Sequence, residues 1–372
     1  MHQASTPQLI SLLRAVSQGQ TGLRLNDFDP VQVRWAVETG LGPLLFRYIR
    51  NDTNAVGSPL WSLVKSADLT ARVLHADQLD AMTEIIDACH GQLPPLTLLK
   101  GLALCEQYYA EPHLRTMRDI DFLVESDAVP VVETLLRNLG YVQKSQRPPE
   151  FYREHQHTTP FFNARTGVWV EVHRALFRAR SGLGLDRVFS LETIRKELGP
   201  GKFRGRPVTL FSNELHIVYL ASHWAFSFAL VGAMHAMLDM ISILRQSPEI
   251  DWQKVLAWLD PSIASAPLYL LLTYLEKYRL VEIPAEVLRG LFLKQRSFGH
   301  LNLVVLHTLI DRYFVGGRAL GMIVSKRNFD IVWGTLLSPG PPSRNLILLP
   351  WNLAPARFLP RRLRFHPEQL VH

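Results

Sequence analysis

Two aspartates, one residue apart, open a short apolar run in the first third of the chain. The run reads D-I-D-F-L-V and begins at Asp119. Because side chains alternate across a strand, Asp119 and Asp121 would point to one face, with their Cα atoms about 6–7 Å apart. Two unpaired carboxylates so close raise each other's pKa, and a shared Mg²⁺ or Mn²⁺ ion would relieve the repulsion. The alternative is a solvated edge strand, because D-x-D occurs by chance in many chains.

Groups suited to phosphate lie just before this run. An earlier apolar run ends at Lys100-Gly101, and a helix-like segment, Leu102 to Tyr109, follows it. Backbone N–H groups around Gly101 would therefore sit at a helix N-terminus, where phosphate binds readily. Lys100, Arg115 and Arg118 add positive charge on either side. The pattern predicts an anion site next to the two aspartates.

A third acid lies on a later strand-like run, V-W-V-E-V-H, which ends at His173. The run is rich in β-branched and aromatic residues, which favour strands. Its alternation places Glu171 and His173 on one face. Together with the D-x-D pair, Glu171 completes a set of three carboxylates.

These motifs resemble the nucleotidyltransferase fold of polymerase β type. Within it, they are similar to the bacterial nucleotidyltransferases with a Lys-Gly turn, an R-x-x-R-D-I-D strand and a later E-x-H strand. The tight match runs from Leu96 to Leu176, with looser similarity in the helices that follow. The resemblance implies that Asp119 and Asp121 bind two metal ions and that Glu171 helps to activate the acceptor hydroxyl.

The resemblance also implies a nucleotide site. It would use Lys100, Arg115 and Arg118 for the triphosphate charge, with His173 beside them. Most of the superfamily has Gly-Ser at the turn, whereas this chain has Gly101 followed by leucine. The turn can therefore offer phosphate only its backbone, helped by Lys100.

The composition is that of a folded protein with a moderate positive charge. The 372 residues are 47% apolar, enough for two domains and a sizeable core. The net charge of +7 favours anionic partners in general. Cys89 and Cys105 form no disulfide framework and no C-x-x-C zinc site, and the first residues lack the features of a secretory signal. We therefore expect a cytoplasmic protein.

The predicted fold class is α+β, a small mixed β-sheet nucleotidyltransferase core with helical regions on both sides. The predicted parts are a helical region 1–90, the core 91–180, a helical domain 181–337 and a Pro/Arg-rich tail 338–372. Within the first part, helices are expected from Pro7 to Ser17, after Asp29-Pro30, and from Leu60 to Cys89. His75 and His90 are expected to be surface or capping histidines rather than metal ligands.

The core should alternate strands and helices. Its predicted elements are a helix from Ala128 to Leu139 capped by Ser126-Asp127 and ended by Gly140, a strand from Tyr141 to Lys144, a mobile loop from Ser145 to Glu154, and a hairpin of Thr158 to Asn163 with Val168 to Leu176. From Leu176 onward the pattern becomes helical. Later helices are expected to start at Asp251-Trp252 and to span Ala266 to Tyr278 and Leu301 to Tyr313.

The stretch from Leu215 to Leu244 is the most apolar in the chain and approaches the length of a membrane span. Histidines and Asp239 recur through it and no basic cluster frames it, so we expect one buried helix and no membrane span. His223 and Asp239 resemble the H…L-D pattern of the family's helical region. The simpler interpretation is a buried His and Asp satisfied by hydrogen bonds.

The tail mixes aromatic residues with arginines. Such a mixture suits single-stranded nucleic acid or an anionic membrane surface, and it equally suits a tail that docks on its own domain. Self-docking is favoured, so nucleic acid is a possible but not the favoured partner.

The sequence thus predicts metal-dependent transfer of a nucleoside monophosphate from an NTP to a small-molecule or biosynthetic-intermediate hydroxyl, with Mg²⁺ or Mn²⁺ as cofactor. One alternative is modification of a tRNA end. Another is a nucleotide-binding or interaction protein without turnover, suggested by the missing Ser. Unpaired buried acids are costly without a metal, which argues against the latter.

Overall fold

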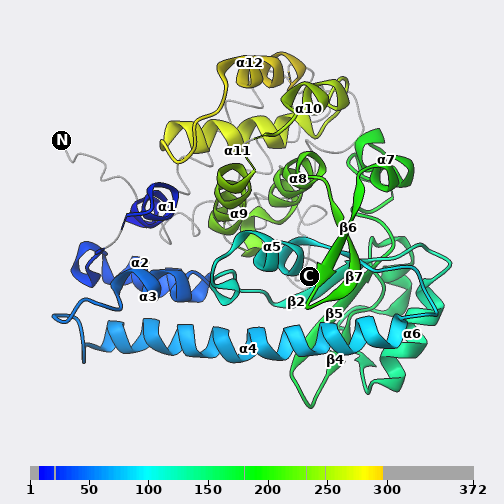
Figure 1. The fold of residues 1–372 in the computed structure, drawn as a ribbon, viewed down its shortest axis with the longest axis horizontal. Coiled ribbons are helices and arrows are strands. Elements are labelled where there is room, and N and C mark those ends of the chain that lie inside the picture. The colour runs from blue at the N-terminus through cyan, green and yellow to red at the C-terminus, as the bar shows by residue number, and fades with distance from the viewer. Residues whose placement is uncertain (1–7, 21, 180, 232, 248, 296–372) are drawn as a thin grey trace, which may run out of the picture.

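The computed structural model describes residues 8–20, 22–179, 181–231, 233–247 and 249–295 of the chain. The predicted helix from Leu301 to Tyr313 and the tail 338–372 lie outside this part. Figure 1 shows the elements in chain order, from the N-terminal helices to α12.

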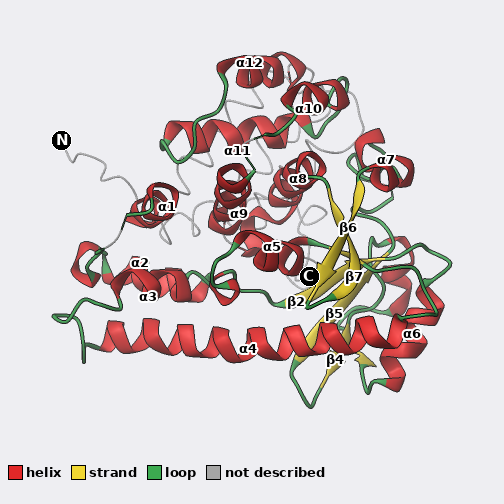
Figure 2. Ribbon diagram, viewed as in Figure 1, coloured by secondary structure: helices red, strands yellow, loops and turns green. Residues whose placement is uncertain are grey.

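A seven-stranded sheet forms the core, with the strand order β3-β4-β5-β2-β1-β7-β6. Its strands are β1 (Thr97–Leu98), β2 (Asp119–Leu123), β3 (Val142–Gln143), β4 (Phe161–Asn163), β5 (Val168–His173), β6 (Leu198–Phe203) and β7 (Arg206–Phe211). β2 runs parallel to β5 and β1 parallel to β7, whereas the other neighbours are antiparallel. The sheet is therefore mixed, and helices precede and follow it (Figure 2), which confirms the α+β fold class.

One face of the sheet is apolar. Ile120 and Phe122 of β2 are fully buried on it. They share a core with residues of α4 (Pro59–Cys89) and α6 (Val129–Asn138). Because β2 alternates, its two aspartates must face the other way.

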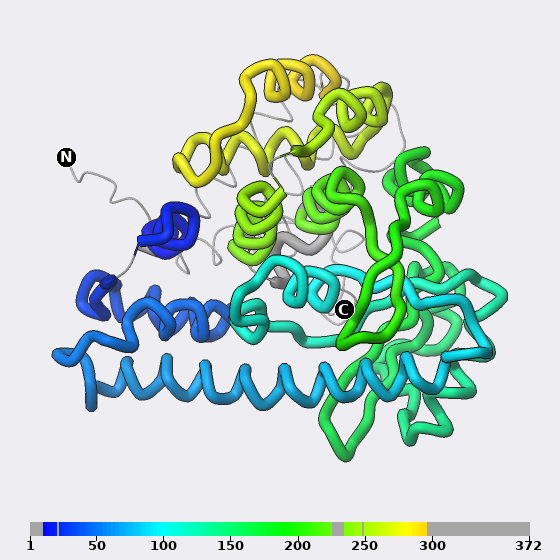
Figure 3. The backbone as a smooth tube through the Cα atoms, viewed as in Figure 1, coloured from blue at the N-terminus to red at the C-terminus, as the bar shows by residue number. Residues whose placement is uncertain are grey.

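Helices from later in the chain lie over the opposite side of the sheet (Figure 3). α8 (Asn213–Val231) packs on α9 (Ala233–Gln246), and α5 (Lys100–Tyr108) contacts both β2 and α9. The remaining helices are α1 (Gln8–Gln18), α2 (Pro30–Glu38), α3 (Gly42–Ile49), α7 (Leu191–Lys196), α10 (Trp252–Trp258), α11 (Ser265–Lys277) and α12 (Ala285–Lys294). No described helix is long and apolar enough to cross a membrane.

Helix ends follow the expected capping chemistry in several places. The Asp29 carboxylate accepts from the backbone N–H of Val31 at 2.7 Å, and proline occupies the first position of α2. Gly140, after α6, has φ of 84°, a left-handed conformation that glycine adopts at no steric cost. His90 is the C-cap residue of α4.

Several expectations about local structure were wrong. Ala128, not Ser126-Asp127, is the N-cap residue of α6, and it makes no side-chain cap. The segment from Ser145 to Glu154 contains a 3₁₀ helix, Pro149–Glu154, rather than a plain loop. Backbone carbonyls of this segment accept hydrogen bonds from the Arg174 guanidinium, including that of Arg153 at 2.7 Å.

Two larger features also differ. The apolar stretch from Leu215 to Leu244 forms two helices, α8 and α9, rather than one. The region after Leu176 is not all helical, because β6 and β7 add a hairpin to the edge of the core sheet, beyond the predicted boundary at residue 180. The division into four parts otherwise remains a prediction.

Candidate active site

Asp121 and Glu171 lie directly opposite each other on two central strands. β2 and β5 pair in parallel, and their register places Asp121 beside Glu171. Residues opposite each other in a sheet point to the same face, so the two carboxylates project together. Asp119, two residues before Asp121, shares that face. The three predicted acids are thus brought to one side of the sheet.

His173 lies between the two central acids. Its Nε2 is 2.8 Å from Asp121 Oδ1 and 3.5 Å from Glu171 Oε2. Its Nδ1 lies 3.4 Å from the carbonyl oxygen of Ala175. Burial lowers the pKa of His173, but hydrogen bonds with Asp121 and Glu171 outweigh it and raise the pKa overall. Both ring nitrogens therefore face acceptors, the Asp121 carboxylate and the Ala175 carbonyl oxygen.

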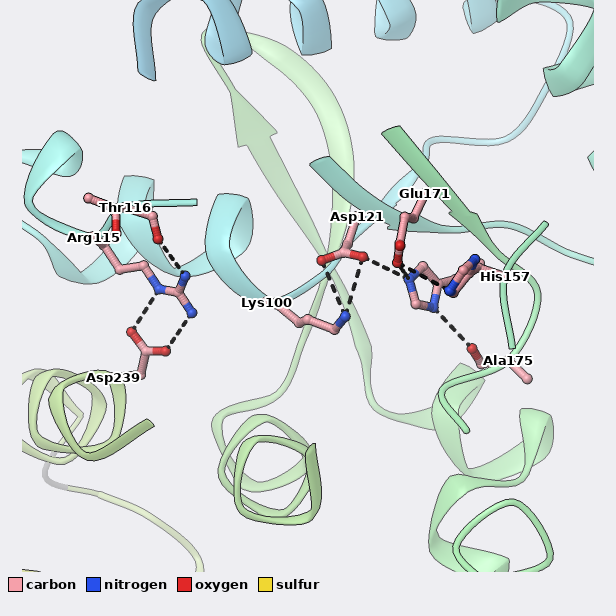
Figure 4. A network of polar contacts seen from close by, with 9 residues as sticks. Lys100, Arg115, Thr116, Asp121, His157, Glu171, Ala175 and Asp239 are labelled. Carbon is pink, nitrogen blue, oxygen red and sulfur yellow. Dashed lines mark hydrogen bonds and ion pairs between the residues drawn. The ribbon is translucent and has the colours of Figure 1, made fainter. Parts of the chain in front are cut away.

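Lys100 is the second cation at the site. Its Nζ is 3.3 Å from both oxygens of Asp121, and its side chain is 14% exposed (Figure 4). Burial lowers the pKa of Lys100, and the attraction of Asp121 more than reverses that change. Its backbone is left-handed, with φ of 43°. This conformation costs a lysine on the order of 1–3 kcal/mol and is typical of functional sites.

The carboxylates differ in their affinity for a proton. Burial, together with the charges of Asp121 and Glu171, raises the pKa of Asp119 to about 7. Burial would also raise the pKa of Asp121, but Lys100 and His173 hold it well below its usual range. The pKa of Glu171 is lowered in the same way: the hydrogen bond from His173 outweighs burial. The site therefore has three carboxyl groups against two basic side chains, those of Lys100 and His173.

His157 was missed by the sequence analysis. Its Nδ1–H donates to the carbonyl oxygen of Thr158 at 2.7 Å, which leaves Nε2 3.4 Å from Glu171 Oε2 (Figure 4). Burial lowers the pKa of His157 to about 4, so this nitrogen carries a lone pair near neutral pH. Two acceptors facing each other need a proton or a cation between them.

Tyr219 and His223 of α8 approach the same acids from the helical side. The Tyr219 hydroxyl is buried and makes no hydrogen bond within the described structure. Burial raises the pKa of Tyr219, and Lys100, Asp121 and Glu171 are close enough to act on it. Tyr219 had no sequence signal beyond being an ionisable residue in an apolar run, whereas His223 was noted for its resemblance to the H…L-D pattern.

A family model described as an uncharacterised nucleotidyltransferase matches residues 30–279. The chain belongs to this family. It is therefore an enzyme of the nucleotidyltransferase type, which moves a nucleoside monophosphate. No curated protein and no solved structure matches it.

The residues predicted to bind phosphate in this nucleotidyltransferase are not all brought together. Arg115 lies away from the acids, and its Nε and Nη2 donate to Asp239 of α9 at 3.1 and 2.9 Å (Figure 4). The Tyr109 hydroxyl donates to the same carboxylate at 2.6 Å. Arg118 is exposed, and no described residue forms an ion pair with it.

Gly101 sits in the first turn of α5, directly after Lys100. A Cβ added to it would lie 2.6 Å from the side chain of Met117, closer than real contacts allow. A larger residue at this position would therefore have to displace the Met117 side chain that packs against Gly101. The positive φ of the turn falls on Lys100 instead.

The acid set fits a divalent cation. Ligand atoms of Asp121, Glu171 and His173 all lie within 4.8 Å of one another. Asp119 adds a third carboxylate, whose pKa is raised to about 7 by burial and by the charges of Asp121 and Glu171. Carboxylate oxygens are the ligands that Mg²⁺ and Mn²⁺ prefer.

Proposed function

We propose that this nucleotidyltransferase has a fold of the polymerase β type and is metal-dependent. It transfers a nucleoside monophosphate from an NTP to a hydroxyl of a small molecule or biosynthetic intermediate. The observation that carries the proposal is the register of β2 and β5, which sets Asp121 beside Glu171. Two strands distant in sequence thereby aim three carboxylates at one point.

Asp119, Asp121 and Glu171 would hold Mg²⁺ or Mn²⁺. When bound, the metal lowers the pKa of the attacking hydroxyl and neutralises the charge on the pyrophosphate that leaves. His173 and Lys100 already lie against Asp121, so they hold the carboxylates in place and supply positive charge to phosphate oxygens.

The remaining phosphate contacts would come from the turn before α5 and from Arg118. Lys100 and the backbone of Gly101 lie at the N-terminus of α5, where N–H groups favour anions. Arg118 is exposed and unpaired with any described acid, so its guanidinium is available to the triphosphate. For Arg115, we propose a positioning role through Asp239, because phosphate would have to displace that carboxylate.

In the proposed transfer, one bond to the α-phosphorus forms and one bond to it breaks. The acceptor oxygen forms a bond to the α-phosphorus, and the bond from that phosphorus to the β-bridging oxygen breaks, releasing pyrophosphate. The acceptor proton passes to Glu171 or to Nε2 of His157, which lie 3.4 Å apart. Solvent then takes it.

Burial of the acids favours a compact acceptor. Asp121 is only 5% exposed, and α8 approaches it through Tyr219. A hydroxyl on a small molecule fits such a covered site better than the end of a folded RNA. We place the enzyme in the cytoplasm, since both cysteines are free and buried.

Product analysis tests the proposal. The protein is incubated with each NTP labelled at the α-phosphate, with Mg²⁺ or Mn²⁺, and with a metabolite extract or tRNA. We expect release of pyrophosphate and label in a small molecule identified by mass spectrometry. Label mainly in tRNA would show that tRNA, rather than a small molecule, is the acceptor. Absence of transfer with every NTP and both metals would overturn the proposed reaction.

A further inference from the structure

A second group of metal-ligating side chains lies where α4 meets α5. It consists of His75 of α4 with Cys105 and Glu106 of α5. One ligand atom from each, the His75 Nε2, the Cys105 Sγ and a Glu106 oxygen, lies within 4.8 Å of the other two. None of the three belongs to the acid cluster of the active site. His75 was expected at the surface, but it is only 8% exposed.

The His75 ring has an unexplained nitrogen. Its Nε2 is buried and has no hydrogen-bond partner among the described residues. The closest carboxylate oxygen, of Glu106, is 3.9 Å away, too far for a hydrogen bond. A buried polar atom left unpaired costs about 1–3 kcal/mol, so natural proteins usually satisfy it. This atom faces the thiol and the carboxylate.

Nearby charged groups are already paired with one another. His113 Nε2 is 3.0 Å from Asp68, and Asp68 also accepts from Arg72 at 2.8 Å. Neither His113 nor Asp68 needs His75 as a partner. The Cys105 thiol makes only a weak 3.4 Å contact to the Leu102 carbonyl, typical for sulfur.

We propose that His75, Cys105 and Glu106 form a Zn²⁺ site. Nitrogen, sulfur and carboxylate oxygen are the ligands that zinc uses, at about 2.0–2.3 Å, usually in a tetrahedral arrangement. In such a site neighbouring ligand atoms lie roughly 3.3–3.6 Å apart. Small side-chain rotations would bring the three atoms to that spacing.

Charge and solvent access are both consistent with this ion. Binding replaces the thiol proton of Cys105, which is released to solvent. The thiolate and the Glu106 carboxylate then balance the two positive charges of zinc, so the buried site is neutral. The Glu106 side chain is 29% exposed, which leaves room for water as the fourth ligand.

The bound ion would fasten α5 to α4. α5 begins at Lys100, so the same helix that carries this site also positions a cation of the active site. The zinc site is thus structural and does not depend on the proposed reaction. Its loss should loosen α5 without removing any catalytic group.

Cobalt substitution on the full chain tests the proposal. A Co²⁺ ion bound by a thiolate shows a sulfur-to-cobalt charge-transfer band, which carboxylate sites do not give. We expect one Co²⁺ per chain to bind with this band and to release one proton as it binds. Added Zn²⁺ should displace the Co²⁺. Cys105→Ser should abolish the band. Cys89→Ser, the matched control at the other buried cysteine, and Asp121→Asn should both retain it.

A second variant, Glu106→Gln, is needed in case the buried Cys105→Ser change prevents folding. The Glu106 side chain is partly exposed, so this change should be tolerated. It should leave the fold intact and weaken Co²⁺ binding at least about tenfold. Absence of the charge-transfer band in the wild-type chain would overturn the proposal. So would a band that survives Cys105→Ser, or Co²⁺ affinity unchanged in Glu106→Gln.

Discussion

Two buried sets of charges appear in Figure 4, and they differ in how their charges balance. Arg115 and Asp239 form one guanidinium–carboxylate pair with two hydrogen bonds, and Asp239 is 1% exposed. In the other set, Asp121 contacts Lys100 and His173, and Glu171 contacts His173. Asp119, which is not drawn there, adds a third carboxylate on the same face of the sheet. The first set is complete within the protein. The second has more carboxyl groups than basic groups, and burial together with the charges of Asp121 and Glu171 raises the pKa of Asp119 to about 7.

The two sets differ in what they do for the protein: a balanced pair stabilises the fold, whereas an unbalanced set of acids can bind a ligand. A buried pair with matched charges joins two parts of a fold, here the segment before β2 and α9. A crowded set of acids on neighbouring strands is costly unless something else binds there. Arg115 and the two aspartates of β2 lie in one short stretch of sequence, so residue type alone could not tell which set each would join.

Glu171→Gln should produce the largest effect. The change keeps the size of the side chain but removes a metal ligand and a proton acceptor. We expect kcat/KM for nucleotidyl transfer to fall about 10⁴-fold, equivalent to roughly 5 kcal/mol, with little change in the thermal unfolding temperature. A fall of less than about tenfold would mean that Glu171 has a structural rather than a catalytic role.

Arg115→Met should act on stability instead. It leaves Asp239 buried without its partner, so the free energy of unfolding should fall by about 3–5 kcal/mol in urea titrations. The double variant Arg115→Met/Asp239→Asn should recover part of this loss. Arg195→Gln, which breaks an exposed pair with Glu125, is the control and should cost at most about 1 kcal/mol.

A different result for Arg115→Met would change the role assigned to this residue. If Arg115→Met left stability unchanged and weakened NTP binding, the guanidinium would belong to the phosphate site after all. The originally predicted role for Arg115 would then replace the positioning role.

His216 tests what burial does to a group with no partner. Neither ring nitrogen makes a hydrogen bond within the described part of the chain, and burial lowers its pKa from 6.5 to about 4. Between these values the unfolded chain binds the proton and the folded chain does not. Stability therefore falls as pH drops through this window, by up to about 3 kcal/mol from this residue.

Urea unfolding of wild type and His216→Leu near about pH 7 and about pH 4.5 measures this contribution. The wild type should lose more stability on acidification than His216→Leu, by roughly 2–3 kcal/mol. Equal losses in both proteins would mean that His216 is protonated in the folded chain.

Tyr219→Phe should have the smallest effect. It removes a buried hydroxyl that has no partner in the described structure, so stability should stay the same or rise slightly. If the hydroxyl contacts substrate, kcat/KM falls about tenfold, the value of one hydrogen bond. Unchanged kinetics would mean that Tyr219 only covers the acids.

The sequence predicted the elements whose signals are local. Alternation placed Asp119 and Asp121 on one face, and the hairpin of β4 and β5 followed from two β-rich runs joined by a turn. β6 was missed because its sequence, L-G-P-G-K-F, contains two glycines and a proline and reads as a loop. It is a strand because it pairs with β7, which itself pairs with β1 from far along the chain.

The sequence predicted the site residues of β2 and β5, and also Lys100 through the Lys-Gly motif. Tyr219 and His157 were not assigned to the site, because their positions depend on tertiary packing. Tyr219 lies on α8, which is apolar all round and so gives no periodic signal for the face that meets the sheet. His157 precedes β4 and reaches Glu171 through the bridge between residue 157 and His173. The Arg115–Asp239 pair joins residues 124 positions apart.

Metal binding by the acids can be measured by calorimetric titration with an NTP in the presence and absence of Mg²⁺, on wild type and Asp121→Asn. Asparagine preserves volume but removes the charge that Lys100 and His173 contact. We expect Mg²⁺-dependent NTP binding by the wild type and none by Asp121→Asn, with both proteins folded. Equal NTP affinity in the two proteins would mean that Asp121 does not bind the metal.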